Sequence, residues 1–312
     1  MLKAEKGTAV IIPCYNEAST IGKVVGDFRR ELPEAAIYVF VNNSTDGTAL
    51  EAARAGAFVI GEPRQGKGNV VRSMLRKIDA DVYVMVDGDD TYDAGSVHEL
   101  IAPVMNGIAD MTVGDRLSST YFSENKRPLH NSGNRLVRWA INSLFSSNLC
   151  DILSGYRCFN REFAKSIPVM SGGFEIETEL TIFALQNKWT IEEVPVLYRD
   201  RPEESVSKLR TIPDGFRIIR KIITLYRDYR PLAFFSLIAA VMLLLAIGFF
   251  IPVYIEYLET GLVARFPTLI CCGIVAVMSL MLFCSGLILQ VVTNQNLKLM
   301  ERLQRLQSGM RP

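Results

Sequence analysis

The sequence predicts an open α/β sheet followed by two helices that cross a membrane. Two observations lead to this fold class. Short apolar runs alternate with amphipathic stretches over about residues 8–198, and two long segments without charged side chains follow. The 34 Lys and Arg residues nearly balance the 33 Asp and Glu residues. A balanced charge creates no field that would attract a polyanion, so we expect no nucleic-acid partner.

The predicted strands are apolar runs without polar alternation, which is typical of strands buried on both faces of a parallel sheet. They cover residues 9–12, 37–41, 57–60 and 82–86. The stretches between them have the length of crossover helices, and they cover residues 18–32, 48–55 and 67–78. Open sheets of this kind bind ligands at the carboxyl ends of their strands. We therefore expect a first domain over residues 1–210 with its ligand site at that edge.

The second part of the chain is predicted to be a transmembrane hairpin over residues 231–292. Residues 231–255 and 266–292 carry no charge, and a helix needs about 20 such residues to cross the hydrocarbon. A buried core helix is the alternative, but core helices are seldom apolar on every side over this length. The short connector returns both flanks to one side of the membrane. Those flanks carry most of the nearby cations, at Arg217, Arg220, Lys221, Arg227, Arg230, Lys298, Arg302 and Arg305.

The positive-inside rule places these flanks in the cytoplasm. We expect a multi-pass protein of the inner (cytoplasmic) membrane with its first domain and both termini cytoplasmic, because the first residues also lack the apolar stretch of a signal peptide. Residues 211–230 are predicted to form an amphipathic helix on anionic head groups, with a soluble core helix as the alternative. Residues 293–312 are predicted to form a cytoplasmic tail helix, whose leucine spacing suits a subunit contact or a membrane surface equally.

The acidic turn that follows residues 82–86 is the strongest chemical signal. Asp87 and Asp89 stand one residue apart at the end of a buried strand, where two carboxylates can hold a divalent cation. Mg²⁺ or Mn²⁺ bridging a diphosphate would neutralise the charge of a departing nucleotide. A solvated turn is the alternative explanation. The chain has only two histidines, which argues against a histidine metal cage and against a Ser-His-Asp site.

A second signal is the glycine-rich turn at residues 64–68 (RQGKG), directly before a predicted helix. Backbone N–H groups at such a turn, together with a lysine, can contact phosphate. The spacing differs from that of a P-loop. Related sequences carry a similar Gly-Lys-Gly, and this resemblance implies that Lys67 contacts a phosphorylated donor.

The turn at residues 13–17 (PCYNE) resembles that of family 2 glycosyltransferases of the GT-A type. The resemblance implies a GT-A (Rossmann-like) sheet and assigns Pro13, Tyr15 and Glu17 to binding of a nucleotide-sugar donor. Residues 42–48 (NNSTDGT) resemble the family's second turn, which adds Asn42 to the donor contacts. Val41 stands where the family commonly has an aspartate that contacts the base, so the identity of the base stays open.

A narrower resemblance, to dolichyl-phosphate mannose synthase and bacterial polyprenyl-phosphate glycosyltransferases, covers residues 113–116 (VGDR), 133–135 (GNR) and 151–157 (DILSGYR). It implies that the lipid phosphate is held by Arg116, Arg135 and Ser154, and that the catalytic residues are Asp89, Asp151 and Arg116. Asp151 is a base or a positioning group there, and positioning is favoured because a phosphate monoester is already largely ionised at neutral pH. Arg157 is expected to pair with an acidic residue.

Residues 201–209 (RPEESVSKL) resemble the family's mobile loop, which closes over the donor diphosphate. The resemblance therefore adds Arg201, Ser207 and Lys208 to the donor contacts. The glutamates of residues 173–180 are explained by the helix dipole, because acidic side chains in a first turn are stabilising.

These features predict inverting transfer of a sugar, glucose or N-acetylglucosamine from UDP, to a polyprenyl (undecaprenyl or dolichyl-type) phosphate. Mannose transfer from GDP-mannose to the same lipid is the alternative. A polysaccharide synthase would usually carry a Gln-x-x-Arg-Trp motif and more membrane spans, and this chain has neither. A noncatalytic membrane scaffold would have no reason to keep the charged residues of one crevice. The family's habit also predicts a homo-oligomer, a dimer or a tetramer.

Overall fold

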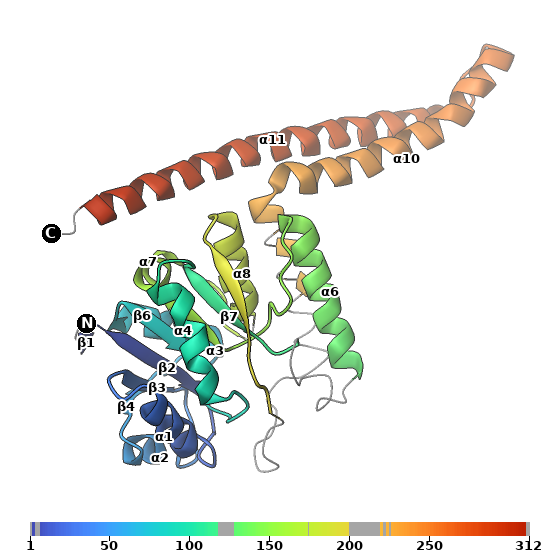
Figure 1. Ribbon diagram of the computed structural model, residues 1–312. Coiled ribbons are helices and arrows are strands. Elements are labelled where there is room, and N and C mark those ends of the chain that lie inside the picture. Colours follow the sequence, from blue (N-terminus) through green and yellow to red (C-terminus); the bar gives the residue numbers. More distant parts are fainter. Residues whose placement is uncertain are drawn as a thin grey trace. The chain divides into compact units, whose positions relative to one another are not determined.

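The computed structural model describes residues 2–3, 7–117, 128–173, 175–199, 219–220, 223–224 and 226–309. It divides into two compact units, residues 1–222 and residues 223–312 (Figure 1). The first unit contains the sheet, and the second contains the apolar helices. The predicted fold class is confirmed: a mainly parallel open sheet is followed by two apolar helices.

The sheet has seven strands in the order β4-β3-β2-β6-β8-β7-β9. Their bounds are Thr8–Cys14 (β2), Ala36–Val41 (β3), Phe58–Gly61 (β4), Val82–Met85 (β6), Met111–Asp115 (β7), Arg157–Asn160 (β8) and Ile191–Pro195 (β9). Neighbouring strands run parallel except at β8, which is antiparallel to both β6 and β7. A separate pair joins β1 (Leu2–Lys3) to β5 (Ile78–Asp79).

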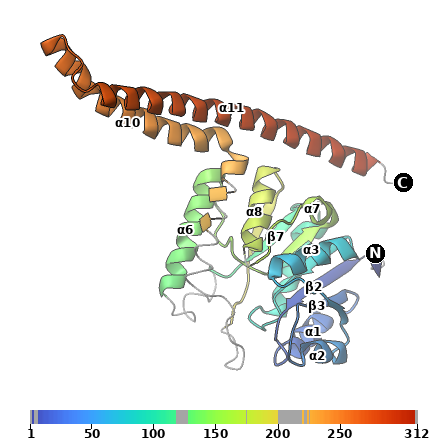
Figure 2. The same cartoon turned by 180° about the vertical axis from the view of Figure 1, so that it is seen from behind.

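Helices cover both faces of the sheet (Figures 1 and 2). One face packs against α1 (Ile21–Glu31), α2 (Thr48–Arg54), η1 (Ala94–Ser96) and α4 (Val97–Met105), and the other against α3 (Lys67–Lys77), α7 (Arg161–Ser166) and α8 (Ile176–Gln186). Alternate residues of β2 serve the two faces, because successive side chains of a strand point to opposite sides. Ile12 belongs to the core beneath α1, α2, η1 and α4, and Ile11 belongs to the core beneath α3, α7 and α8. The helix α6 (Pro128–Phe145) also belongs to this unit.

Helix α1 begins at Ile21, three residues after the predicted start at Ala18. The reason lies in the contacts of the preceding turn. The Glu17 amide donates to the Thr48 hydroxyl at 2.9 Å, and the Ala18 amide donates to the Asp46 carboxylate at 3.1 Å. The turn after β2 is therefore tied to the turn after β3, and the helix starts only beyond these bonds.

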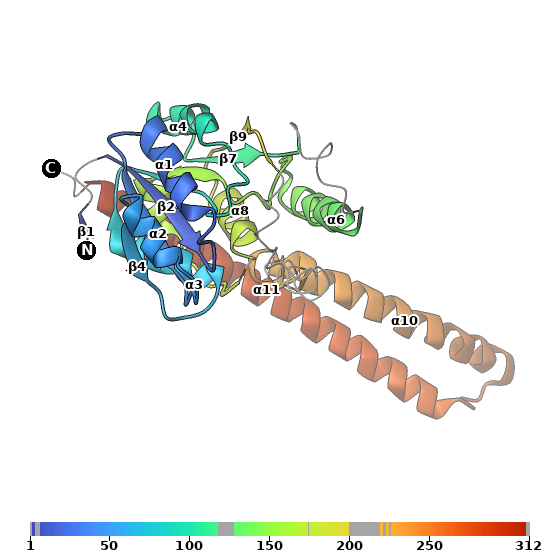
Figure 3. The same ribbon diagram turned by 90° about the horizontal axis from the view of Figure 1, so that it is seen from below.

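The second unit is an antiparallel hairpin of α10 (Pro231–Thr260) and α11 (Phe266–Gly309), which Figure 3 shows side by side. Helix α10 ends at Gly261, whose φ of 69° is left-handed. The Ser279 hydroxyl donates to the Ala239 carbonyl at 2.7 Å across the pair. Both helices, over Pro231–Thr260 and Phe266–Asn296, are long and apolar enough to cross a membrane, and only 11% and 17% of their most apolar windows are buried.

Helix α11 continues without a break beyond residue 293, where we expected a separate tail helix. The predicted amphipathic helix at residues 211–230 is described only in part: residues 219–220, 223–224 and 226–229 are helical. Its other positions before residue 226 lie outside the described residues, as do residues 201–209.

Candidate active site

Lys67 sits at the start of α3 between two carboxylates. Its Nζ lies 2.5 Å from Asp87 Oδ1 and 2.5 Å from Glu177 Oε1, and only 11% of the Lys67 side chain is exposed. Burial opposes the charge of Lys67, but the two carboxylates outweigh it and raise the pKa of this ammonium above its ordinary value. Lys67 is therefore a fixed cation beside the acidic turn.

Two glycines bring Lys67 to this place. A side chain at Gly66 or Gly68 would overlap the carbonyls of Gly172 and Ser171, and Gly66 has a φ of 122° that favours glycine. The start of α3 can therefore lie directly against the backbone that leads into α8. This approach sets Lys67 of α3 beside Glu177 of α8.

The acidic turn directs its three carboxylates differently. Asp87 meets Lys67, whereas Asp90, with a φ of 58°, accepts from Lys23 at 2.5 and 2.6 Å. Asp89 is 3% exposed and accepts from the Thr91 hydroxyl at 2.6 Å. Asp87 and Asp89 thus follow the carboxyl end of β6 and are bound by Lys67 and Thr91, while Asp90 is held by helix α1.

The residues around Gly88 suit a hard divalent cation in part. Within the described ranges, no group of three or more His, Cys, Asp and Glu residues could hold a metal ion. Two carboxylates nevertheless match the oxygen ligands that Mg²⁺ prefers, and this ion usually completes its coordination with water and substrate phosphates. The donor set therefore fits a cation that binds together with a diphosphate.

The predicted nucleotide contacts have different surroundings. Tyr15 is 38% exposed, Pro13 is half-buried at the end of β2, and Glu17 is buried. Asn42, a predicted donor contact, bonds to the backbone of a neighbouring loop. This side chain is 3% exposed, its Nδ2 donates to the carbonyls of Glu62 and Arg64 at 2.8 Å, and its Oδ1 accepts from the Gly66 amide at 2.7 Å. Asn42 therefore shapes the loop before α3 through these three bonds.

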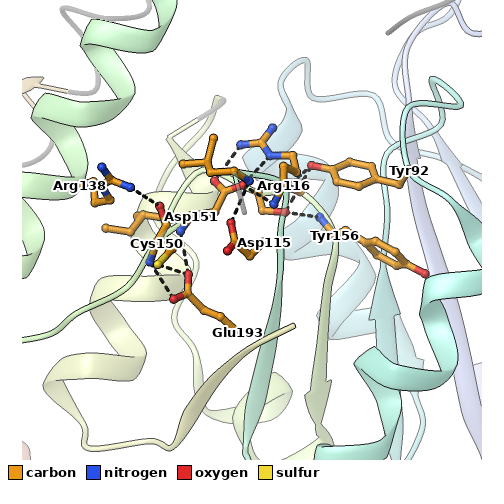
Figure 4. A network of polar contacts seen from close by, with 12 residues as sticks. Tyr92, Asp115, Arg116, Arg138, Cys150, Asp151, Tyr156 and Glu193 are labelled. Atoms are coloured by element: carbon orange, nitrogen blue, oxygen red, sulfur yellow. Dashed lines mark hydrogen bonds and ion pairs between the residues drawn. The ribbon is translucent and has the colours of Figure 1, made fainter. Parts of the chain in front are cut away.

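Arg116 and Asp151 form the second half of the site (Figure 4). Arg116 Nε and Nη2 donate to the two carboxylate oxygens of Asp151 at 2.7 and 2.9 Å, and the Arg116 amide donates to Oδ2 at 3.1 Å. The Tyr198 ring lies 5.3 Å from the guanidinium carbon. Burial opposes the charge of Arg116, but Asp151 outweighs it and raises its pKa. The pair fixes one guanidinium in a single orientation.

The loop that carries Asp151 is held by hydrogen bonds from the Arg157 side chain to its backbone carbonyls. Arg157 is fully buried, and its guanidinium donates to the carbonyls of Ile152 at 2.6 Å and Ser154 at 2.9 Å and to the Thr181 hydroxyl at 2.9 Å. Arg157 was expected to pair with an acidic residue. Within the described chain its hydrogen-bond partners are these oxygens and the sulfur of Met111, while Glu177 and Asp151 act on it through their charges. Burial lowers the pKa of Arg157 to about 10, which still leaves the side chain charged at neutral pH.

The same loop joins the two halves of the site. The Gly155 amide donates to the Tyr92 hydroxyl at 2.9 Å, and a side chain at Gly155 would overlap the Asp87 carboxylate. The Ser154 hydroxyl, predicted to contact the lipid phosphate, is instead fully buried and lies 3.4 Å from the Tyr92 hydroxyl. Ser154 therefore packs the loop and presents no surface to a phosphate.

Other predicted site residues are not brought to this cluster by any described contact. Arg135 is exposed on α6. Arg201, Ser207 and Lys208 lie outside the described residues. Three contributors were not predicted as site residues: Glu177, Glu193 and Tyr198. The sequence signal for Glu177 was hidden by its place in a first helical turn, where the dipole alone explains an acid.

Comparison with known proteins identifies the family. The family described as glycosyl transferase family 2 matches residues 9–167, more than half of the chain. The chain belongs to glycosyl transferase family 2. The matched region of this family 2 glycosyltransferase contains Lys67, the acidic turn, and the Arg116–Asp151 pair.

Similar curated proteins and solved structures agree with this assignment. Glycosyltransferase AglJ of Haloferax volcanii is 33% identical over 249 residues, which are 80% of each chain. A protein of the same organism named dolichyl-phosphate hexose transferase is 30% identical over 222 residues, 71% of this chain and 95% of that protein. Glucosyl-3-phosphoglycerate synthase from Mycobacterium tuberculosis, solved with Mn²⁺, UDP and glucosyl-3-phosphoglycerate, superposes with a TM-score of 0.57 at 21% identity over 72% of this chain and 80% of that chain. This structural similarity shows the fold.

Proposed function

We propose that this family 2 glycosyltransferase transfers a sugar from a nucleoside diphosphate to a polyprenyl phosphate, with inversion at the anomeric carbon. The observation that carries the proposal is that one short loop contacts two separate charged clusters. Gly155 packs against Asp87 beside the Lys67 cation, and Asp151 of the same loop holds the Arg116 guanidinium. One half suits a diphosphate donor and the other a phosphate acceptor.

The donor half is proposed to bind the diphosphate through Lys67 and the start of α3, where backbone N–H groups favour anions. Asp87 and Asp89 would hold Mg²⁺ or Mn²⁺ together with the diphosphate oxygens. When bound, such a cation neutralises the charge that develops on the leaving nucleotide. The solved neighbour that contains Mn²⁺ and UDP supports this choice. UDP-glucose or UDP-N-acetylglucosamine is the proposed donor.

The acceptor half is proposed to grip the lipid phosphate with Arg116. Asp151 engages two of the five N–H groups of a guanidinium, and it fixes the plane in which the others lie. A phosphate oxygen attacks the anomeric carbon, a new C–O bond forms, and the bond to the nucleotide oxygen breaks with its electron pair leaving on the diphosphate. The attacking phosphate is already ionised, so Asp151 acts as a positioning group and no base is required.

The two apolar helices support a lipid acceptor, because a polyprenyl chain lies in the membrane while its phosphate lies at the head groups. The name of the relative dolichyl-phosphate hexose transferase supports the same acceptor class. We propose that both helices cross the inner membrane and that the sheet domain and both termini face the cytoplasm. Assembly into a homo-oligomer stays a prediction.

The decisive experiment incubates the purified full-length chain with undecaprenyl phosphate, Mg²⁺ or Mn²⁺, and a panel of radiolabelled UDP- and GDP-sugars. We expect label from one UDP-sugar in acid-labile, organic-extractable lipid. Asp89→Asn should abolish it, whereas Glu192→Gln, which removes a charge from an exposed side chain of β9, should not. Label from GDP-mannose alone would change the proposed donor. Absence of lipid label with every donor, from a protein that binds nucleotide, would refute the proposed acceptor.

A further inference from the structure

Glu193 is a carboxylate of the site region that the proposed mechanism does not use. It lies in β9, where it is paired in register with Val113 of β7, two residues before that strand ends at Asp115. Its neighbour Glu192 is exposed, whereas Glu193 is half-buried. Since successive side chains of a strand point to opposite faces, only Glu193 can reach the loop that precedes β8.

Glu193 binds the backbone of that loop through both of its oxygens. Oε1 accepts from the Cys150 amide at 2.8 Å and from the Asp151 amide at 2.7 Å, and Oε2 accepts from the Cys150 amide at 2.7 Å (Figure 4). Bonds from N–H groups to a carboxylate are charge-assisted and stronger than neutral ones. Two consecutive amides are thereby aimed at one side chain, which fixes the orientation of the Cys150–Asp151 peptide.

The opposite side of this peptide is held as well. Arg138 Nη1 of α6 donates to the Cys150 carbonyl at 3.3 Å. Asp151 then extends its carboxylate to Arg116, with 2% of the Asp151 side chain and 12% of the Arg116 side chain exposed. The position of the Arg116 guanidinium therefore depends on Asp151, and the position of Asp151 depends on Glu193.

Several carboxylates lie close together around Glu193. Burial raises the pKa of Glu193, the amides of Asp151 and Cys150 lower it, and the nearby carboxylates of Asp115 and Asp151 raise it further. Carboxylates that share one region disfavour each other's charge. Groups kept in such surroundings concentrate at functional sites.

We propose that Glu193 is a positioning residue for the acceptor phosphate: it fixes the Cys150–Asp151 peptide, and through Asp151 it holds Arg116 in the orientation that meets the phosphate. This inference rests on the proposed function in one respect, the assignment of Arg116 to the acceptor. The contact of Glu193 with the loop does not depend on that assignment, so the two can be tested separately.

The test compares Glu193→Gln with the matched control Glu192→Gln on the same strand. The glutamine amide would turn an N–H₂ group towards the Cys150 amide, which is itself a donor, so the bond of Oε2 is lost. We expect the KM for polyprenyl phosphate to rise about tenfold or more, as the loss of a charged hydrogen bond implies, while the KM for the nucleotide sugar changes less than about twofold. Hydrogen exchange at the amides of residues 150–151 should accelerate by a similar factor, and Glu192→Gln should alter none of these quantities.

A double variant separates positioning from general damage. If Glu193 acts through Asp151, Glu193→Gln should add nothing to the acceptor KM of Asp151→Asn. Additive effects, or an equal rise of both KM values, would overturn the proposal. Should Glu193→Gln fail to fold, Glu193→Asp keeps the charge but withdraws it from the amides, and an unchanged acceptor KM in that variant would overturn it too. A wild-type chain that glycosylates no lipid defeats the proposed function alone, because exchange at residues 150–151 still tests the contact.

Discussion

The substitution Lys67→Met tests the ion cluster of the donor half. It keeps the length of the side chain and removes the charge that Asp87 and Glu177 share at 2.5 Å. Both carboxylates are mostly buried, with 26% and 6% of their side chains exposed, so the loss leaves two charges without their partner. Removing one member of a buried pair typically costs about 3–5 kcal/mol.

For a domain of this size, that cost corresponds to a fall of roughly 6–20 °C in the thermal midpoint. Arg76→Met is the matched control, because Arg76 is an exposed residue of the same helix. The midpoint is measured by thermal unfolding of the full chain in detergent, with nucleotide binding recorded alongside. If Lys67 contacts the diphosphate as proposed, loss of that charged hydrogen bond should weaken UDP binding by about tenfold or more.

The pKa of Lys67 determines how its contribution to stability depends on pH. The raised pKa of Lys67 means that its contribution to stability is complete below the ordinary value of 10.5 and is lost only as pH rises through the raised value. The wild-type cluster should therefore add no pH dependence between about pH 6 and pH 9. In Lys67→Met the two carboxylates repel each other, because the cation between them is gone.

The companion variant Lys67→Met/Glu177→Gln removes one of the uncompensated charges. It should recover part of the lost stability, because the remaining carboxylate no longer faces a like charge. If Lys67→Met unfolds at the same temperature as Arg76→Met, or if adding Glu177→Gln lowers the midpoint further, the assignment of Lys67 as the counter-ion of this cluster is refuted.

Three further substitutions test separate parts of the chain. Gly155→Ala would push a methyl group into the Asp87 carboxylate, so the KM for the nucleotide sugar should rise several-fold in steady-state assays and the thermal midpoint should fall as Asp87 is displaced from Lys67. Asp89→Asn should abolish binding of Mn²⁺ in the presence of UDP, measured by electron paramagnetic resonance, because one of the two proposed carboxylate ligands is lost. Ser279→Ala removes the bond to the Ala239 carbonyl and should destabilise the hairpin by about 0.5–1.5 kcal/mol, measured by unfolding of the chain in detergent.

Each of these has a control of the same chemistry. Gly26→Ala adds a methyl group where no atom lies within 4 Å, so an equal KM effect there would contradict the account of Gly155. Asp27→Asn removes an acid of α1, and loss of Mn²⁺ binding in that variant would show that Asp89 acts only through net charge. Ser285→Ala removes a bond to Met281 within the same helix, and equal destabilisation would argue against a contact between the helices at Ser279.

The strands and crossover helices could be predicted because their signal is local. Buried parallel strands are continuous apolar runs, and the predicted range 37–41 differs from β3 by one residue. The start of α1 could not be predicted, because the amides before it bond to Asp46 and Thr48 about thirty residues further along the chain. Such bonds exist only once the sheet has brought the two turns together.

The candidate site shows the same division. The places of Asp87 at a strand end and of Lys67 in a glycine-rich turn could be predicted, because both local features are visible in the sequence. Their shared partner Glu177 could not, since an acid in a first helical turn already has a sufficient local explanation. Asn42 and Ser154 were predicted as ligand contacts but are buried in loop bonds. Polar residues that shape a loop and polar residues that bind a ligand look alike in sequence.

The reversed direction of β8 has a consequence for how acceptors could change. Because β8 runs against β6 and β7, the segment that precedes it arrives at the same edge of the sheet where those strands end. The number of residues between Asp151 and Arg157 then sets the distance between the Arg116–Asp151 pair and Asp87. Lengthening or shortening this segment would alter that spacing while every strand pair stayed in register. Under the proposed function, the length of this one loop would set the distance between the donor and acceptor phosphates.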